Sequence, residues 1–80
     1  MTVMEVSNEF IGRRIKFARV KAGLTQGELG GKLDPIRSDV AIGYMEKGKS
    51  RVYLVDILRI AELTDQSVTF FMDPDVRAKV

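Results

Sequence analysis

The sequence predicts an all-α fold in a single domain, and three observations favour it. Apolar residues recur at three- and four-residue spacing along most of the chain, as they do on one face of a helix. Residues that cap helix N-termini precede most of these segments, and glycine or proline follows most of them. No repeat, low-complexity stretch or linker divides the 80 residues, which are enough for one small core. We expect one domain over residues 1–80, with its core at about 8–72 and a short tail at each end.

The first predicted helix begins at Ser7 or Asn8, runs to Ala22 and stops at Gly23. Its inward positions are apolar at helical spacing, namely Ile11, Ile15, Ala18 and Ala22. Five other positions are basic, and we expect some of them to approach phosphate: Arg13, Arg14, Lys16, Arg19 and Lys21.

The second predicted helix runs from about Gln26 to Leu33. Thr25 and Glu28 stand at the spacing of a capping box, in which each side chain satisfies a backbone N–H of the first turn. A small residue at Gly30 would let the following helix pack closely. The dipeptide 34–35, Asp-Pro, ends this helix because proline disfavours a helical conformation before it.

The third predicted helix spans about Asp39 to Glu46. Ser38 suits its N-cap, and a lysine followed by a glycine suits its C-terminal end. Ile42 and Met45 fit one inward face, which leaves the following residues wholly or partly outward: Asp39, Val40, Gly43 and Tyr44. Two short helices in this order are what a helix-turn-helix needs.

After a basic loop over residues 49–51, a fourth helix is predicted from about Tyr53 to Leu63. Ser67 can cap a short fifth helix, Val68 to Met72, and the dipeptide 73–74 (Asp-Pro) could begin a last turn through Ala78. Large apolar residues fill four of the five positions 68–72, more than one short helix can bury in its own domain. We therefore expect a dimer interface formed by Val68, Phe70, Phe71 and Met72. The alternative is that Phe70 faces the core and Phe71 covers a seam.

The composition excludes several classes of protein. The chain has no cysteine and no histidine, so disulfides, thiolate metal sites and the commonest general base are absent. We expect no enzymatic activity, no bound metal and no cofactor. No apolar run approaches the roughly 20 residues of a membrane-spanning helix, and no signal peptide opens the chain, which favours a cytoplasmic protein without membrane partners.

Charge is distributed unevenly along the sequence. Residues 9–51 hold ten Lys/Arg against five Asp/Glu, whereas residues 52–80 hold three against five. A basic front half beside a mildly acidic rear half indicates one face for a polyanion and another for a different partner. A solvated surface with chance asymmetry would give the same pattern.

The motifs together resemble the Xre/Cro-type helix-turn-helix family, which has the lambda-repressor-like fold. The resemblance covers about Phe10 to Met72. Its most specific parts are Gly-Leu-Thr-Gln at 23–26 and Glu-Lys-Gly-Lys at 46–49, followed without a gap by the pattern of the fourth helix. The resemblance implies a five-helix domain that binds double-stranded operator DNA as a homodimer, most simply as a repressor.

The resemblance also implies roles for individual residues. Gln26 would touch the DNA backbone and brace the recognition helix, residues 38–44 would lie in the major groove, and Arg19 would form a structural ion pair with Glu46. The complete candidate DNA-binding set is Thr25, Gln26, Arg37, Ser38, Asp39, Val40, Gly43, Tyr44, Lys47, Lys49 and Arg51. Within it, Lys47, Lys49 and Arg51 fall where the family contacts phosphate.

Two departures from the family pattern concern sequence readout. The connection before Ser38 is two residues longer than usual, which adds Ile36 and Arg37. The outer face of the third helix lacks Arg, Asn and Gln, the side chains that read guanine and adenine through paired hydrogen bonds. Arg37 and Tyr44 are therefore the expected base readers. The poor reading face leaves open a protein-interaction module, such as an antitoxin or anti-regulator with weak DNA binding, and a second regulatory protein as partner.

Overall fold

The structure is a computed structural model that describes residues 7–80, so residues 1–6 of the expected N-terminal tail lie outside the described part. Within residues 7–80 the chain contains no strand. The helices are α1 (Asn8–Lys21), α2 (Gln26–Gly31), α3 (Asp39–Glu46), α4 (Leu54–Thr64) and the 3-10 helix η1 (Val68–Phe71). The all-α prediction is confirmed, but the count of five α-helices is not, because the fifth element is a single 3-10 turn.

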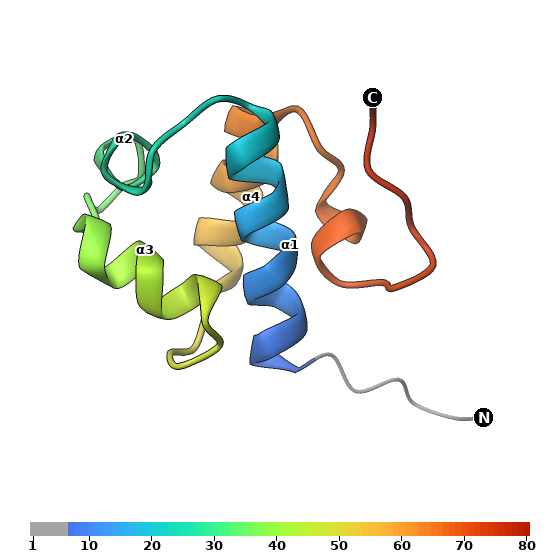
Figure 1. Cartoon of the computed structure of the whole chain (residues 1–80), viewed down its shortest axis with the longest axis horizontal. Helices are drawn as coiled ribbons and strands as arrows, with labels where there is room; N and C mark the ends of the chain where they lie inside the picture. Colours follow the sequence, from blue (N-terminus) through green and yellow to red (C-terminus); the bar gives the residue numbers. More distant parts are fainter. Residues whose placement is uncertain (1–6) are drawn as a thin grey trace.

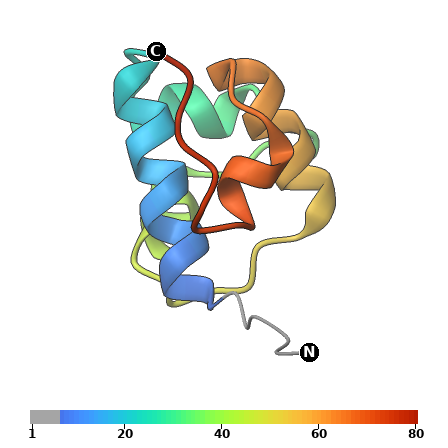
Figure 2. The ribbon, with the colours of Figure 1, turned by 90° about the vertical axis from the view of Figure 1, so that its right-hand side faces the viewer.

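The helices α1 and α4 occupy the middle of the molecule (Figure 1). The pair α2 and α3 lies on one side of them, and η1 with the C-terminal segment lies on the other (Figures 1 and 2). The two short helices of the predicted helix-turn-helix therefore stand on the side of the molecule opposite the C-terminal segment. Among the described residues, no helix is both long enough and apolar enough to cross a membrane.

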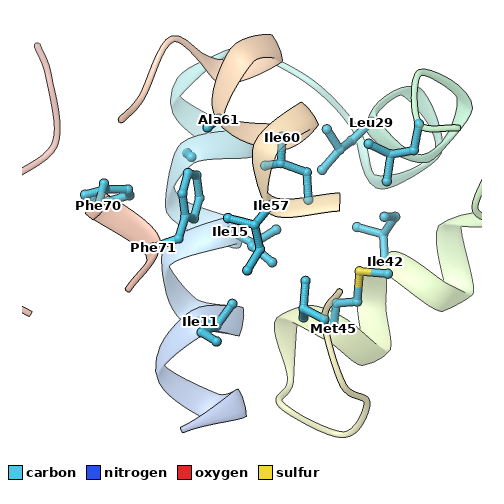
Figure 3. Close-up of a cluster of buried hydrophobic side chains, with 13 residues drawn as sticks. Ile11, Ile15, Leu29, Ile42, Met45, Ile57, Ile60, Ala61, Phe70 and Phe71 are labelled. Atoms are coloured by element: carbon cyan, nitrogen blue, oxygen red, sulfur yellow. The ribbon is translucent and has the colours of Figure 1, made fainter. Parts of the chain in front are cut away.

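One hydrophobic core joins all five elements (Figure 3). Its fully buried members include Ile15 of α1, Leu29 of α2, Ile42 of α3 and Ile60 of α4. Gly12 permits the close approach of α1 and α3, since a Cβ at that position would lie 2.3 Å from the carbonyl oxygen of Met45. The predicted role of Gly30 is also explained, because a Cβ there would lie 2.1 Å from the carbonyl oxygen of the residue before Ser38.

Helix boundaries follow the capping residues. Ser7 Oγ accepts from the backbone N–H of the third residue of α1, and Thr25 with Glu28 forms the complete capping box of α2. The predicted bounds of α3 are those of the structure. The second helix ends two residues before the predicted Leu33, and α4 begins and ends one residue later than predicted.

The last turn predicted from Asp73 to Ala78 is not helical. The guanidinium of Arg14 donates to three carbonyl oxygens of this region, those of residues 70, 74 and 76, at 3.2, 3.1 and 2.7 Å. The signals at Asp73 do form a single turn, in which the Asp73 carbonyl accepts from the N–H of residue 76 at 3.1 Å and Asp73 Oδ1 accepts from the N–H of residue 75 at 3.0 Å. The turn does not continue as a helix to Ala78, and the carbonyls held by Arg14 lie along this segment.

The predicted dimer interface is also corrected by the fold. Phe70 and Phe71 are buried within one chain, with 3% and 0% of their surface exposed, and their rings pack edge to face at 5.2 Å. The short η1 turn aims both rings inward, where Phe71 enters the core and Phe70 lies beneath the Arg14 guanidinium. Val68 packs against the core, and only Met72 is substantially exposed. Phe70 and Phe71 therefore present no surface to a second copy.

Candidate nucleic-acid interface

The outward face of α3 is built by its caps and by the burial of its other side. Ser38 Oγ accepts from the backbone N–H of Ala41 at 3.0 Å, and Asp39 Oδ1 accepts from the N–H of Val40 at 2.8 Å. Ile42 and Met45 are buried, as predicted, so Val40 and Tyr44 are left 58% and 50% exposed. The helix therefore presents a short, half-apolar ridge to solvent.

A shallow depression of about 320 Å³ lies between this ridge and the start of α2. Six residues of the candidate DNA-binding set line it: Gln26, Asp39, Val40, Gly43, Tyr44 and Lys47. The structure thus brings together residues that are up to 21 positions apart in the sequence.

A second depression, of about 310 Å³, lies on the other flank of α3. Tyr44 lines both depressions, and Arg51 lines the second beside Tyr53. Lys47, Lys49 and Arg51 are exposed and form no ion pair within residues 7–80. These three cations directly follow the exposed ridge in the sequence. Cations in such positions could neutralise the phosphates on either side of a helix bound to a nucleic acid.

A buried polar network fixes α3 against α1 and α2. Arg19 Nε donates to Glu46 Oε2 at 2.6 Å and Arg19 Nη2 donates to Glu46 Oε1 at 3.0 Å, while the amide of Gln26 donates to Glu46 Oε1 at 3.1 Å. The side chains of Arg19 and Glu46 are only 12% and 3% exposed. Hydrogen bonding to Glu46 raises the pKa of Arg19, so the guanidinium stays charged. The predicted ion pair is thus present, and Gln26 completes it.

The same network positions Gln26 over α3. Its amide atoms lie 3.5 to 3.8 Å from the place where a Cβ on Gly43 would be, which is ordinary van der Waals contact. The start of α2 is itself held by the capping box, and the backbone N–H of Thr25 lowers the pKa of Glu28 by donating to its carboxylate. Thr25 and Gln26 therefore stand at a fixed distance from the exposed ridge.

Arg37 lines the second depression together with Tyr44 and Arg51, but its charged end is paired within the chain. Its Nη2 donates to Asp56 Oδ2 of α4 at 3.0 Å, and its side chain is 25% exposed against 1% for that of Asp56. Its backbone N–H also donates to the carbonyl of Gly30 at 3.0 Å. The lengthened connection thus anchors the start of α3 to α2 and α4. The role of Arg37 as a base reader stays a prediction, and in this structure its guanidinium pairs with a buried carboxylate.

Two functional features were missed from the sequence. The first is Asp56, which occupies an inward position of α4 beside Ile57 and Ile60. A charge on an apolar stripe is a signal for a buried ion pair, and this signal was present in the sequence. The second is the outward face of α4, where Leu54, Val55 and Leu58 are each at least 50% exposed. No group of three or more potential metal ligands occurs among the described residues.

Comparisons with known proteins bear on this surface. No protein-family model matches the chain, and no curated protein sequence matches it significantly. Among solved structures, the chain is similar to the restriction-modification controller protein C.AhdI from Aeromonas hydrophila. The TM-score is 0.68, with 28% identity over 80% of this chain and 94% of that one.

Two further structures share the fold. The P22 c2 repressor protein, solved in complex with a synthetic operator, matches with a TM-score of 0.70 and 25% identity over 81% of this chain and 96% of that one. Hydroxypropylphosphonic acid epoxidase from S. wedmorenis matches with a TM-score of 0.71 over 85% of this chain but only 35% of its own length. At 16% identity the likeness to the epoxidase shows the fold alone.

Proposed function

Because the chain has the fold of the Xre/Cro-type, lambda-repressor-like helix-turn-helix proteins, we propose that it is a sequence-specific DNA-binding regulator of transcription. In this proposal it acts as a homodimeric repressor that places α3 in the major groove of a palindromic operator. The observation that carries the proposal is the exposed ridge of α3, which is braced by the buried network of Arg19, Gln26 and Glu46. Exposed cations that form no ion pair within residues 7–80 flank this ridge.

The ridge offers three kinds of base contact. Tyr44 can donate a hydrogen bond to a base edge or a phosphate, Val40 can contact a thymine methyl group, and Asp39 can accept from the amino group of cytosine. The cations at 47, 49 and 51 supply contacts to phosphate, which fix the position of the domain without reading sequence. With Arg37 paired to Asp56, readout depends on fewer and weaker contacts than an arginine would provide.

One short helix reads too few base pairs for selectivity, which favours a two-fold dimer. The outward face of α4 is suited to the contact between copies, because Leu54, Val55 and Leu58 form one continuous apolar stripe. Arg59 and Glu62 continue the same face and already pair with each other. Across a two-fold axis, the Arg59 of each copy can meet the Glu62 of the other, since an isologous contact matches a surface to itself.

The experiment that tests the function is selection of bound duplexes from a random DNA pool at moderate and at raised salt. We expect enrichment of a palindrome with half-sites about 34 Å apart, one turn of DNA. Salt-sensitive binding without enrichment would contradict sequence-specific readout. Absence of binding at either salt would contradict the DNA-binding function.

A first variant tests the phosphate contacts. Replacing Arg51 with alanine is expected to weaken binding to all duplexes and to reduce the slope of log K against log salt by about two, because each copy of the dimer neutralises one phosphate fewer. Fluorescence anisotropy of a labelled duplex over a series of salt concentrations measures both quantities. Lys32→Ala is the matched control, since this exposed cation lies at the C-terminal end of α2 and lines neither depression. An unchanged slope for Arg51→Ala would remove that residue from the phosphate contacts.

A second variant tests the dimer. Leu58→Glu is expected to give monomers in sedimentation equilibrium, because the two-fold axis would bring two carboxylates together in an apolar contact. Val20→Glu is the matched control, since Val20 is 58% exposed on α1 and should tolerate a charge without change of assembly. If Leu58→Glu still sediments as a dimer, the interface lies elsewhere.

One observation favours a second function, that of a protein-interaction module with weak DNA binding. Among the described residues, the outward face of α3 has no Arg, Asn or Gln, and Arg37 is turned toward α4. A partner protein could use the apolar ridge of Val40 and Tyr44 in place of DNA. If the folded, dimeric protein bound no duplex at either salt concentration of the selection, the result would favour this function.

A further inference from the structure

A groove of about 660 Å³ runs between α1 and the C-terminal segment, on the side of the molecule away from α3. Figure 2 views this side, with the C-terminal segment running between α1 and η1. The volume lies within the usual range for small-molecule sites, about 300–1,000 Å³. None of the residues that line the groove belongs to the candidate DNA-binding set.

The floor of the groove is apolar and aromatic. Phe17 is 51% exposed on a helix whose other outward residues are mostly charged, and its ring packs against that of Phe70 at 6.0 Å. Val76 and Ala78 of the C-terminal segment complete the apolar lining. About half of the Phe17 surface is therefore open to an apolar ligand.

The outer wall of the groove is held at both ends. Arg14 binds the carbonyls of residues 70, 74 and 76, as described above. At the other end, the amide of buried Gln66 accepts from the backbone N–H of Lys79 at 2.8 Å and donates to its carbonyl at 3.3 Å. The groove is therefore formed before any ligand enters, which lowers the cost of binding.

The rim of the groove is positively charged. Arg13, Lys21, Arg77 and Lys79 line it and are exposed, and none of them forms an ion pair within residues 7–80. Among residues 7–80, no Asp or Glu side chain lines the groove. Four cations around an aromatic floor complement a molecule that has an apolar body and an acidic group.

We propose that this groove binds an amphiphilic organic anion, a small molecule with an aromatic or aliphatic body and a carboxylate, sulfonate or phosphate group. The apolar body lies on Phe17, and the acidic group meets the cations of the rim. A nucleic-acid duplex would contact the cations of the rim but not the apolar floor. Substitutions in the floor therefore distinguish the two kinds of ligand. The site is independent of the proposed DNA interface, because the two surfaces share no residue.

The test is a fluorescence titration of the whole chain with 8-anilino-1-naphthalenesulfonate, an aromatic sulfonate that becomes fluorescent in apolar sites. We expect saturable binding at one site per chain. Phe17→Ser and Lys79→Glu should each weaken it about tenfold, since one removes the floor contact and the other reverses a charge of the rim. The uncharged analogue N-phenyl-1-naphthylamine should bind about tenfold more weakly than the sulfonate.

The control variant is Val20→Ser, which alters an exposed apolar residue of α1 that does not line the groove and should leave the titration unchanged. Loss of binding in Val20→Ser, or equal binding of the uncharged analogue, would overturn the proposal. Displacement of the probe by a short duplex at low salt would assign the rim to DNA and would also overturn it. Lys79→Glu alters an exposed side chain, so it remains informative even if Phe17→Ser fails to fold, which circular dichroism would reveal.

Discussion

Replacing Glu46 with alanine is expected to lower the free energy of unfolding by about 3–5 kcal/mol, the usual cost of leaving one partner of a buried ion pair uncompensated. The guanidinium of Arg19 is only 12% exposed and would keep a single hydrogen bond, to the carbonyl of Leu24 at 2.9 Å. Gln26 would lose its partner in the same step. Urea denaturation followed by circular dichroism measures the change.

Two comparisons separate this effect from a general sensitivity to charge removal. Glu62→Ala removes a carboxylate that also pairs with an arginine, but this pair is 47% and 70% exposed and should contribute less than about 1 kcal/mol. The double variant Arg19→Met/Glu46→Leu should recover most of the stability, because apolar residues can replace a buried pair at little cost. A loss below 1 kcal/mol for Glu46→Ala would contradict the buried network.

Much of the helix-turn-helix could be predicted from the sequence, because local signals determine it. Ser38 and the lysine-glycine pair at 47–48 determine the first and last residues of α3. Thr25 and Glu28 determine where α2 begins. These interactions connect residues three or four positions apart, so a pattern in the sequence is sufficient to find them.

The features that could not be predicted depend on partners far apart in the chain. An arginine in a loop looks the same whether it faces DNA or pairs with Asp56, 19 residues later. From the sequence alone, Phe70 and Phe71 resemble residues of an interface. In the structure they are buried, and Arg14, which lies 56 residues before Phe70, holds the segment against α1. In both cases a side chain from another element decides which way the residue faces.

The pairing of Arg37 with Asp56 leads to an asymmetric prediction. Replacing Arg37 with alanine should cost about 3 kcal/mol of stability, since it leaves a carboxylate that is 1% exposed without its cation. Replacing Asp56 with alanine should cost less, because Arg37 is already 25% exposed and can turn its charge to water. If Arg37 instead contacted bases, Arg37→Ala would lower the affinity for DNA and leave the free energy of unfolding unchanged.

The double variant Arg37→Ala/Asp56→Ala provides the decisive comparison. If the pair is structural, the double variant should be more stable than Arg37→Ala alone, because no buried charge remains. DNA affinity should then depend on how well the start of α3 is held, since Arg37 directly precedes the N-cap Ser38 and its backbone N–H also bonds to Gly30. We expect both single variants to weaken binding to the selected operator without altering which bases are preferred. A change in the preferred bases of Arg37→Ala would show that this arginine leaves Asp56 and reads DNA.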